Sequence, residues 1–239
     1  MIPFVLIHGA WHGAWCWEKL TPILEAAGHH VLAPNLPGHG GDRTPLAEVT
    51  LDLYANRLCE LLDTLSEPAI LVGHSMGGIV ISQAAERRPS RVRTLAYVSG
   101  FLLRDGQSLL DVAGADTESL LLPNLEWAAD GRSARVAPAA VREAFYAECS
   151  ELDAIASAAR LTAQPTAPTT TPVHVTEPRF GSIPRVYVEC RHDRAVSPGS
   201  QRAMYTATPC VRVASLATDH SPFYSAPERL AGVLLSLTK

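Results

Sequence analysis

The sequence has no apolar run long enough to cross a bilayer and no block of like charge. A membrane-spanning helix needs about 20 consecutive apolar residues, so we expect no membrane partner. Lys and Arg together number 20 and Asp and Glu 24, which gives a formal net charge of −4. This balance argues against a nucleic-acid-binding protein and against a polybasic membrane surface.

Motifs for metals, cofactors and export are also missing. The sequence lacks HExxH, paired CxxC and a dinucleotide fingerprint, so we expect no metal and no cofactor. The N-terminal stretch "MIPFVLIHGAWHG" has no basic region and no cleavage site, so we interpret it as a first strand and expect a cytoplasmic protein. The cysteines are odd in number and widely spaced, which favours free thiols over disulfides or metal ligands: Cys16, Cys59, Cys149, Cys190 and Cys210.

What the sequence does contain is an alternation of short apolar runs with amphipathic segments. Its 239 residues suffice for one large α/β domain. The apolar runs predict strands at 3–7, 30–35, 69–73, 93–100, 185–190 and 210–215. Helical periodicity and stop signals predict helices at 17–28, 51–65, 77–89 and 227–237. Strands that alternate with helices favour a mostly parallel six-stranded sheet flanked by helices.

One long segment, from Phe101 to Gly181, interrupts the alternation. Three stretches within it have a helical pattern, at 117–130, 137–150 and 152–161, and a Thr/Pro-rich connection follows at 162–178. An insertion of this length is too long for a simple loop. We therefore expect a helical cap at 101–181, inserted after the fourth strand, on a core formed by 1–100 and 182–239. The alternative is that the Thr/Pro-rich stretch is a disordered linker between two domains.

The stretch "LVGHSMGGIV", at 71–80, joins a predicted buried strand to a predicted helix through Gly-x-Ser-x-Gly. This is the context of a nucleophile elbow, a sharp turn that exposes a serine hydroxyl above the carboxyl ends of the strands. Gly73 and Gly77 would remove side chains that collide in such a turn. A phosphate-binding loop would instead need GxxxxGK[ST] or GxGxxG. We therefore predict that Ser75 is a nucleophile.

A serine nucleophile needs a base and an orienting carboxylate, which follow it in the order acid, then histidine. His220 is the predicted base, because it lies between the last strand and the last helix, at the edge of the sheet where Ser75 lies; His174 and His192 are the alternatives. Asp193 directly follows the fifth predicted strand and is the predicted acid. Asp105 and Asp219 are the weaker candidates for that role.

An ester carbonyl under attack becomes an oxyanion that needs preorganised donors. The backbone N–H of Met76, directly after the nucleophile, is one expected donor. The second is expected from the loop after the first strand, where Gly9 permits a close approach and Ala10 donates its N–H. His8, His12 and His39 are interpreted as structural residues of such loops.

The stretches "FVLIHGAWHGAWCWEKL", "GHSMGG", "FGSIPRVYVEC" and "DHSPFYSAPERLA" give the chain a family resemblance over nearly its whole length. The chain resembles the α/β-hydrolase branch that holds plant methyl esterases, such as salicylate methyl esterase, and plant α-hydroxynitrile lyases. The resemblance implies an α/β-hydrolase fold and a microbial-type esterase of this branch. Trp127 falls where the relatives carry a cap tryptophan at the pocket entrance, so it is a candidate gate; the alternative is a core aromatic residue of the cap. The other candidates for substrate contacts are Gly9, Trp11, Leu121, Leu122 and Phe145.

Two positions separate the chemistries that this branch contains. The lyases that the chain resembles carry Thr at the position of Gly9 and Lys at the position of Ser221. Without that hydroxyl the Gly9 loop suits an oxyanion hole, and without that cation a leaving cyanide has no obvious partner, so hydrolysis is favoured. We expect a serine carboxylesterase acting on small to medium esters, including methyl or aryl esters. A lyase or C–C bond hydrolase on the same triad, or a non-catalytic ligand receptor, remains the alternative, and a homodimer is an assembly that the sequence leaves open.

Overall fold

A computed structural model describes residues 2–238. Its main sheet has six strands, all parallel, in the order β2-β1-β3-β4-β8-β9. These strands are β1 (Phe4–Ile7), β2 (Val31–Leu32), β3 (Ala69–His74), β4 (Val92–Val98), β8 (Arg185–Cys190) and β9 (Arg212–Leu216). The six predicted sheet strands are therefore confirmed, with shorter bounds for the second, and so is the parallel sheet.

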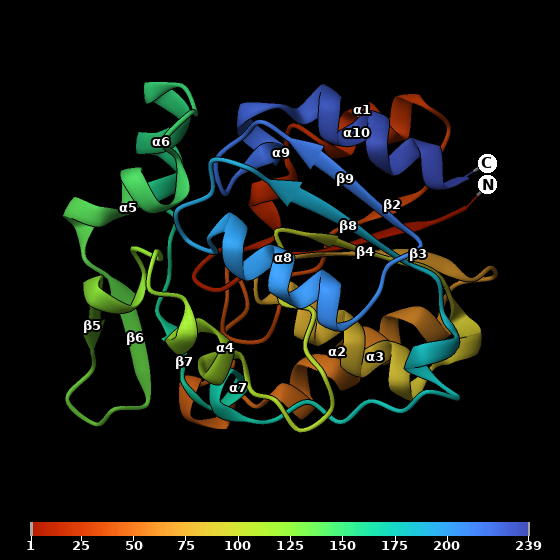
Figure 1. The fold of residues 1–239 in the computed structure, drawn as a ribbon, viewed down its shortest axis with the longest axis horizontal. Helices are drawn as coiled ribbons and strands as arrows, with labels where there is room; N and C mark the ends of the chain where they lie inside the picture. Colours follow the sequence, from red (N-terminus) through yellow and green to blue (C-terminus); the bar gives the residue numbers. More distant parts are fainter. Residues whose placement is uncertain (1, 239) are drawn as a thin grey trace.

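Helices cover both faces of this sheet (Figure 1). The main ones are α1 (Thr21–Ala26), α2 (Leu51–Asp63), α3 (Gly77–Arg87), α8 (Pro198–Ala207) and α10 (Pro227–Leu235). Short helical pieces complete the core: η1 (Ala14–Trp17), η2 (Leu46–Glu48), η3 (Pro89–Arg91), α9 (Pro222–Ser225) and η6 (Ser236–Thr238). The four predicted helices are present, whereas α8 was not among the predictions.

The inner strands β1, β3, β4 and β8 are buried on both faces, which is why they read as continuous apolar runs rather than alternating ones, whereas the edge strand β9 is mostly exposed. In β1, Val5 and Ile7 belong to the hydrophobic cluster that includes residues of α2, α3 and α8, whereas Phe4 and Leu6 belong to the cluster that includes residues of α1 and α10. Each face of the sheet thus has its own hydrophobic core, and both cores include fully buried aromatic side chains. None of the helices within residues 2–238 combines the length and apolarity needed to cross a membrane.

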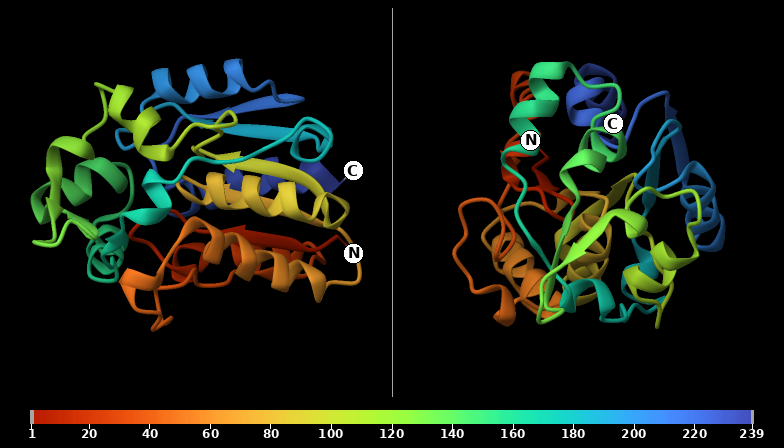
Figure 2. Two further views of the ribbon diagram at one scale, coloured as in Figure 1. Left: turned by 90° about the horizontal axis from the view of Figure 1, so that it is seen from below. Right: turned by 90° about the vertical axis from the view of Figure 1, so that its left-hand side faces the viewer.

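Between β4 and β8 the chain forms a cap beyond the carboxyl ends of the strands, where the arrowheads of β8 and β9 point (Figures 1 and 2). The cap contains helices α4 (Leu109–Ala115), α5 (Pro138–Phe145), α6 (Glu151–Ala158) and α7 (Ala167–Thr170), with the turn η4 (Leu122–Asn124); a second turn, η5 (Phe180–Ser182), directly precedes β8. It also contains a three-stranded antiparallel sheet of β5 (Leu125–Trp127), β6 (Ser133–Val136) and β7 (Gln164–Pro165).

The prediction of a helix at 117–130 is wrong. A single 3-10 turn at η4 contains Pro123, which cannot continue a helix interior. The chain then extends as β5 and pairs with β6, so that Leu125 lies opposite Val136. A short apolar run does not distinguish a strand from a helix by its periodicity alone. The helices expected at 137–150 and 152–161 are present as α5 and α6.

The Thr/Pro-rich stretch at 162–178 contributes β7 to the cap sheet and then packs on the core. Its backbone accepts hydrogen bonds from Gln83 and Gly106, at His174 O (2.9 Å) and Val173 O (2.9 Å). The strands on either side of the insertion, β4 and β8, are hydrogen-bonded neighbours. The five cysteines are free thiols; four are buried and Cys210 is partly exposed.

Candidate active site

Ser75 occupies a sharp turn between β3 and α3. Its φ is +51°, a left-handed conformation that costs a non-glycine residue about 1–2 kcal/mol. Three backbone hydrogen bonds hold this turn: Ser75 N–H donates to Val98 O (3.2 Å), and Ser75 O accepts from the N–H groups of Gly78 and Phe101 (both 3.0 Å). The strained turn thus persists because its neighbours fix it on two sides.

The glycines around Ser75 provide clearance, as expected from the sequence. A Cβ on Gly73 would lie 2.7 Å from Gly77 O, and a Cβ on Gly77 would lie 2.5 Å from Ile7 O. A Cβ on Gly9 would lie 2.8 Å from Cβ of Ser75. These distances are too short for ordinary contacts, so the packing of β1, β3 and α3 around the serine requires glycine.

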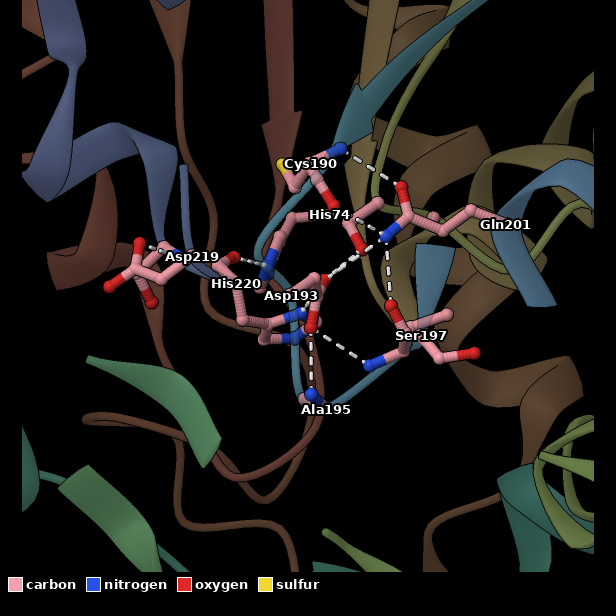
Figure 3. Close-up of polar contacts among 12 residues, drawn as sticks. His74, Cys190, Asp193, Ala195, Ser197, Gln201, Asp219 and His220 are labelled. Carbon is pink, nitrogen blue, oxygen red and sulfur yellow. Dashed lines mark hydrogen bonds and ion pairs between the residues drawn. The ribbon is translucent and has the colours of Figure 1, made fainter. Parts of the chain in front are cut away.

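His220 and Asp193 form a buried pair, although 27 residues separate them. His220 Nδ1 lies 2.6 Å from Asp193 Oδ2, and both side chains are almost fully buried (Figure 3). An ionised carboxylate only accepts hydrogen bonds, so we assign the Nδ1 proton to His220, which leaves Nε2 able to accept a proton. His74, which directly precedes Ser75, lies against His220 with 4.5 Å between ring centroids. The base therefore lies beside the elbow.

Backbone and side-chain donors hold the Asp193 carboxylate in place. Its Oδ1 accepts from the N–H groups of Ala195 (2.7 Å) and Val196 (2.9 Å), and its Oδ2 accepts from the Ser99 hydroxyl. Gln201 Nε2 lies 3.5 Å from the same Oδ2 (Figure 3). These contacts fix the orientation of the carboxylate toward His220.

The alternative candidates lie elsewhere. Asp219 caps its own loop, where Oδ1 accepts from Ser221 N–H (3.1 Å) and the Ser225 hydroxyl (2.7 Å). The Asp105 side chain is 65% exposed, close to an exposed His174. His192 is half exposed and paired with Glu148. Only Asp193 and His220, among the candidates that the sequence offered, are brought together beside Ser75.

Three residues that support this pair were not predicted from the sequence to be functional. His74 Nε2 donates to His220 O (2.9 Å) and so fixes the loop that carries the base. Burial, with His220 and His12 nearby, holds the pKa of His74 well below its usual value, so its ring is neutral.

Ser99, with φ of +43°, contacts Asp193 from the end of β4. Gln201 bridges from α8 to Cys190 N–H and O (both 3.0 Å). The sequence could have indicated Ser99, because it lies at the polar carboxyl end of the fourth predicted strand. It gave no indication of Gln201, which lies in α8, the main helix of the core that was not predicted.

The two expected oxyanion donors, Ala10 and Met76, line the same cavity as Ser75. Within residues 2–238, neither backbone N–H has a hydrogen-bond acceptor. Both are thus free to bind an oxygen that enters the cavity. Free backbone donors on the wall of the cavity that Ser75 lines are the kind of group that an oxyanion hole requires.

The histidines of the first loop are structural, in keeping with the sequence interpretation. His12 Nδ1 donates to Ala10 O (2.8 Å), and its Nε2 accepts from the Tyr146 hydroxyl (2.8 Å). Burial lowers the pKa of His12 to about 3, so the ring is neutral and can accept that bond. His8 likewise bonds Gly9 O (2.8 Å) through Nδ1 and accepts from Leu36 N–H (3.0 Å). These bonds hold the loop that carries the Ala10 N–H.

A mostly apolar cavity lies above Ser75, between the core and the cap. Four of the six predicted contact residues line it: Trp11, Leu121, Leu122 and Trp127. The other two do not. Gly9 packs beneath Ser75. Phe145 packs behind the site, and its ring centroid lies 5.6 Å from that of His220 and 5.7 Å from that of Trp11.

Several polar side chains of the cavity wall already have partners. Gln164 bonds His39 (2.9 Å) and Pro165 O (2.9 Å), and the Ser119 hydroxyl donates to Ala195 O (2.7 Å). They therefore offer few open groups to a ligand, and the cavity is suited to an apolar group. In the part of the chain that the structure describes, no three His, Cys, Asp or Glu side chains gather as metal ligands would.

Comparison with known proteins shows what the chain is similar to. A family model described as the alpha/beta hydrolase family matches residues 4–233. Methylesterase 7 of Arabidopsis thaliana is 32% identical over 247 residues, which cover 98% of this chain and 95% of that protein. Putative methylesterase 15, chloroplastic, of the same plant is 32% identical over 250 residues, 99% of this chain and 56% of that protein.

Solved structures include one of a pyrethroid hydrolase that is 30% identical to this chain. It superimposes with a TM-score of 0.88 over 98% of this chain and 96% of that one. The chain spans only about half the length, 56%, of the first two curated relatives that it matches.

Proposed function

The chain belongs to the alpha/beta hydrolase family, within its methylesterase branch, and on that basis we propose that it is a serine carboxylesterase. The observation that carries the proposal is the buried His220–Asp193 pair, 2.6 Å between Nδ1 and Oδ2, against the strained turn of Ser75. A serine hydroxyl is a weak nucleophile unless a base can take its proton, and the pair supplies an oriented base.

In the proposed mechanism the Ser75 hydroxyl attacks an ester carbonyl while His220 Nε2 takes its proton. The N–H groups of Ala10 and Met76 stabilise the oxyanion. His220 then gives the proton to the leaving alcohol, and an acyl-enzyme forms on Ser75. Water, deprotonated by His220, releases the acid. Asp193 keeps the imidazole in the required tautomer and stabilises its charged form.

We propose a small to medium ester with an apolar or aromatic part as the substrate. The apolar cavity and the satisfied polar side chains of its wall support this class. The names of the relatives fit it as well, since they describe methylesterases and a hydrolase of pyrethroids. Methyl and aryl esters are therefore the first substrates to assay.

Gly9 and Ser221 argue against a lyase reaction on the same residues. A threonine in place of Gly9 would put its Cβ 2.8 Å from that of Ser75, so the lyase hydroxyl has no room without a shift of the loop. Ser221 is buried and carries no charge that could hold a cyanide anion. We expect ester hydrolysis and no cleavage of mandelonitrile.

The test is Ser75→Ala. This variant should lose turnover of p-nitrophenyl acetate and labelling by a fluorophosphonate while keeping the circular dichroism spectrum of the unmodified protein. Full turnover of p-nitrophenyl acetate by the Ser75→Ala variant would refute the proposal. Labelling of the unmodified protein without turnover of any ester would instead favour a ligand receptor.

We further propose that the protein works in the cytoplasm and pairs with a second copy of itself. The five free thiols support a reducing compartment. Light scattering on a size-exclusion column tests the homodimer, and a mass equal to one chain of 25.6 kDa would refute it.

A further inference from the structure

Trp11 lies between two hollows of the molecule. One is the cavity above Ser75. The other is a groove between the cap strands and helices α5 and α6. The groove is lined by Trp11, Glu126, Arg135, Val136, Pro138, Val141, Ala158, Leu161 and Thr162. Trp11 is the residue that lines both, so its side chain belongs to the wall between them.

The strands β5 and β6 form the rest of that wall. Side chains alternate between the two faces of a strand. Leu125 and Trp127 of β5 line the catalytic cavity, whereas Glu126 lines the groove. In β6, Ala134 lines the cavity, whereas Arg135 and Val136, the last residue of the strand, line the groove. The catalytic cavity and the groove are therefore separated by one layer of strand.

Two hydrogen bonds hold Trp11 against the residues around it. Its indole Nε1 donates to Ala134 O of β6 at 2.9 Å, and its carbonyl oxygen accepts from Thr162 N–H at 2.9 Å. The Phe145 ring packs on it, with 5.7 Å between ring centroids. The indole is thus held in place where the wall meets the loop of Ala10.

The backbone of Trp11 is strained, with φ of +61°. A bulky residue rarely adopts this conformation, and glycine would adopt it without cost. A strained tryptophan persists only when its contacts offset the cost. The hydrogen bond to β6 and the packing of the indole supply such contacts.

We propose that Trp11 is a partition that limits the length of the apolar group that the catalytic cavity accepts. This inference rests on the proposed esterase function. Without the indole, the cavity above Ser75 and the groove would join into one channel. Several residues of the groove are apolar (Val136, Pro138, Val141 and Leu161), so the joined channel would take a long alkyl chain.

The experiment compares p-nitrophenyl esters from acetate to laurate, using the full-length protein and Trp11→Ala. Each additional buried CH₂ changes binding several-fold. We expect the ratio of kcat/KM for laurate to kcat/KM for acetate to rise about tenfold or more in Trp11→Ala, mainly through a lower KM for laurate. Trp11→Gly removes the indole and relieves the strain, and serves as the second variant if Trp11→Ala does not fold.

Two controls separate the partition from a merely structural role. Trp11→Phe keeps a ring in the wall and should keep the chain-length profile of the unmodified protein. Adding Leu161→Trp to Trp11→Ala refills the groove and should cancel the gain for laurate. A uniform loss of activity at every chain length in both Trp11→Ala and Trp11→Gly would overturn the proposal, as would a gain that Leu161→Trp leaves intact.

Fluorophosphonate labelling distinguishes a failure of the partition proposal from a failure of the esterase proposal. If the variants are labelled at Ser75 and turn over acetate without a change in chain-length preference, the partition is wrong and the esterase stands. If the unmodified protein is not labelled and hydrolyses no ester of the series, the esterase proposal itself fails.

Discussion

Replacing Gly77 by alanine should destabilise the protein and slow the reaction, although alanine is the better helix former. Gly77 is the first residue of α3, and a Cβ there would lie 2.5 Å from Ile7 O and 2.9 Å from His8 O. Ordinary contacts begin near 3.4 Å. The helix must therefore move away from β1, which carries the loop of Ala10.

The magnitude follows from two opposed effects. Helix propensity favours alanine over glycine by about 1 kcal/mol, and forcing a methyl group into a packed backbone contact costs about 1–3 kcal/mol or more. We expect a net loss of about 2 kcal/mol, which lowers Tm by about 4–8 °C for a chain of this size. The shift also moves the Met76 N–H, so kcat/KM should fall at least about tenfold, part of the roughly 10²–10³ that a complete oxyanion donor contributes.

Gly232→Ala is the matched control, because Gly232 lies in α10 with no heavy atom within 4 Å of the place that an added methyl group would occupy. It should raise stability by about 0.5–1 kcal/mol and leave activity unchanged. Urea unfolding measures the stability of both variants, and turnover of p-nitrophenyl acetate measures their activity. If Gly77→Ala matched Gly232→Ala in stability and activity, the need for clearance at the elbow would be refuted.

Two further predictions concern the side chains around Ser75. Asp193→Asn should lower kcat/KM for p-nitrophenyl esters by about 10³–10⁴, because an amide neither fixes the His220 tautomer nor stabilises its charge; a loss below tenfold would contradict the role of Asp193. His12 has a pKa of about 3 in the folded chain and about 6.5 unfolded, so between these values the unfolded chain binds more protons and stability falls as pH falls. This one group contributes a slope of about 1.4 kcal/mol per pH unit at most. The urea midpoint of His12→Gln should therefore decline less from pH 7 to pH 5 than that of the unmodified protein, and equal declines would count against the buried neutral ring.

The elbow could be predicted because its signals are local. The apolar run before Ser75, the glycines around it and the helical pattern after it lie within one short stretch. A strand, a sharp turn and a helix each follow from nearest-neighbour sterics and periodicity. The same reasoning predicted the parallel sheet, because buried strands and amphipathic helices alternate along the chain.

The cap was predicted less well, because its strands depend on partners far away in the sequence. Leu125 pairs with Val136, and Ala134 pairs with Gln164 of β7. Such pairing is a property of the folded chain, and no local pattern announces it. The prediction of a helix at 117–130 failed for this reason.

The sequence alone thus determined the family, the class of fold and a short set of candidate residues. Position after a strand ranked the candidate acids and bases, but the sequence did not show which of them lie close together in the folded chain. Only the tertiary structure decided that Asp193, held by Ser99 and two backbone N–H groups, meets His220, whereas Asp219 caps a loop. It alone also set Trp11 between the catalytic cavity and the groove. The physical reason is common to both: hydrogen bonds and packing between residues far apart in the chain depend on where the strands end in space.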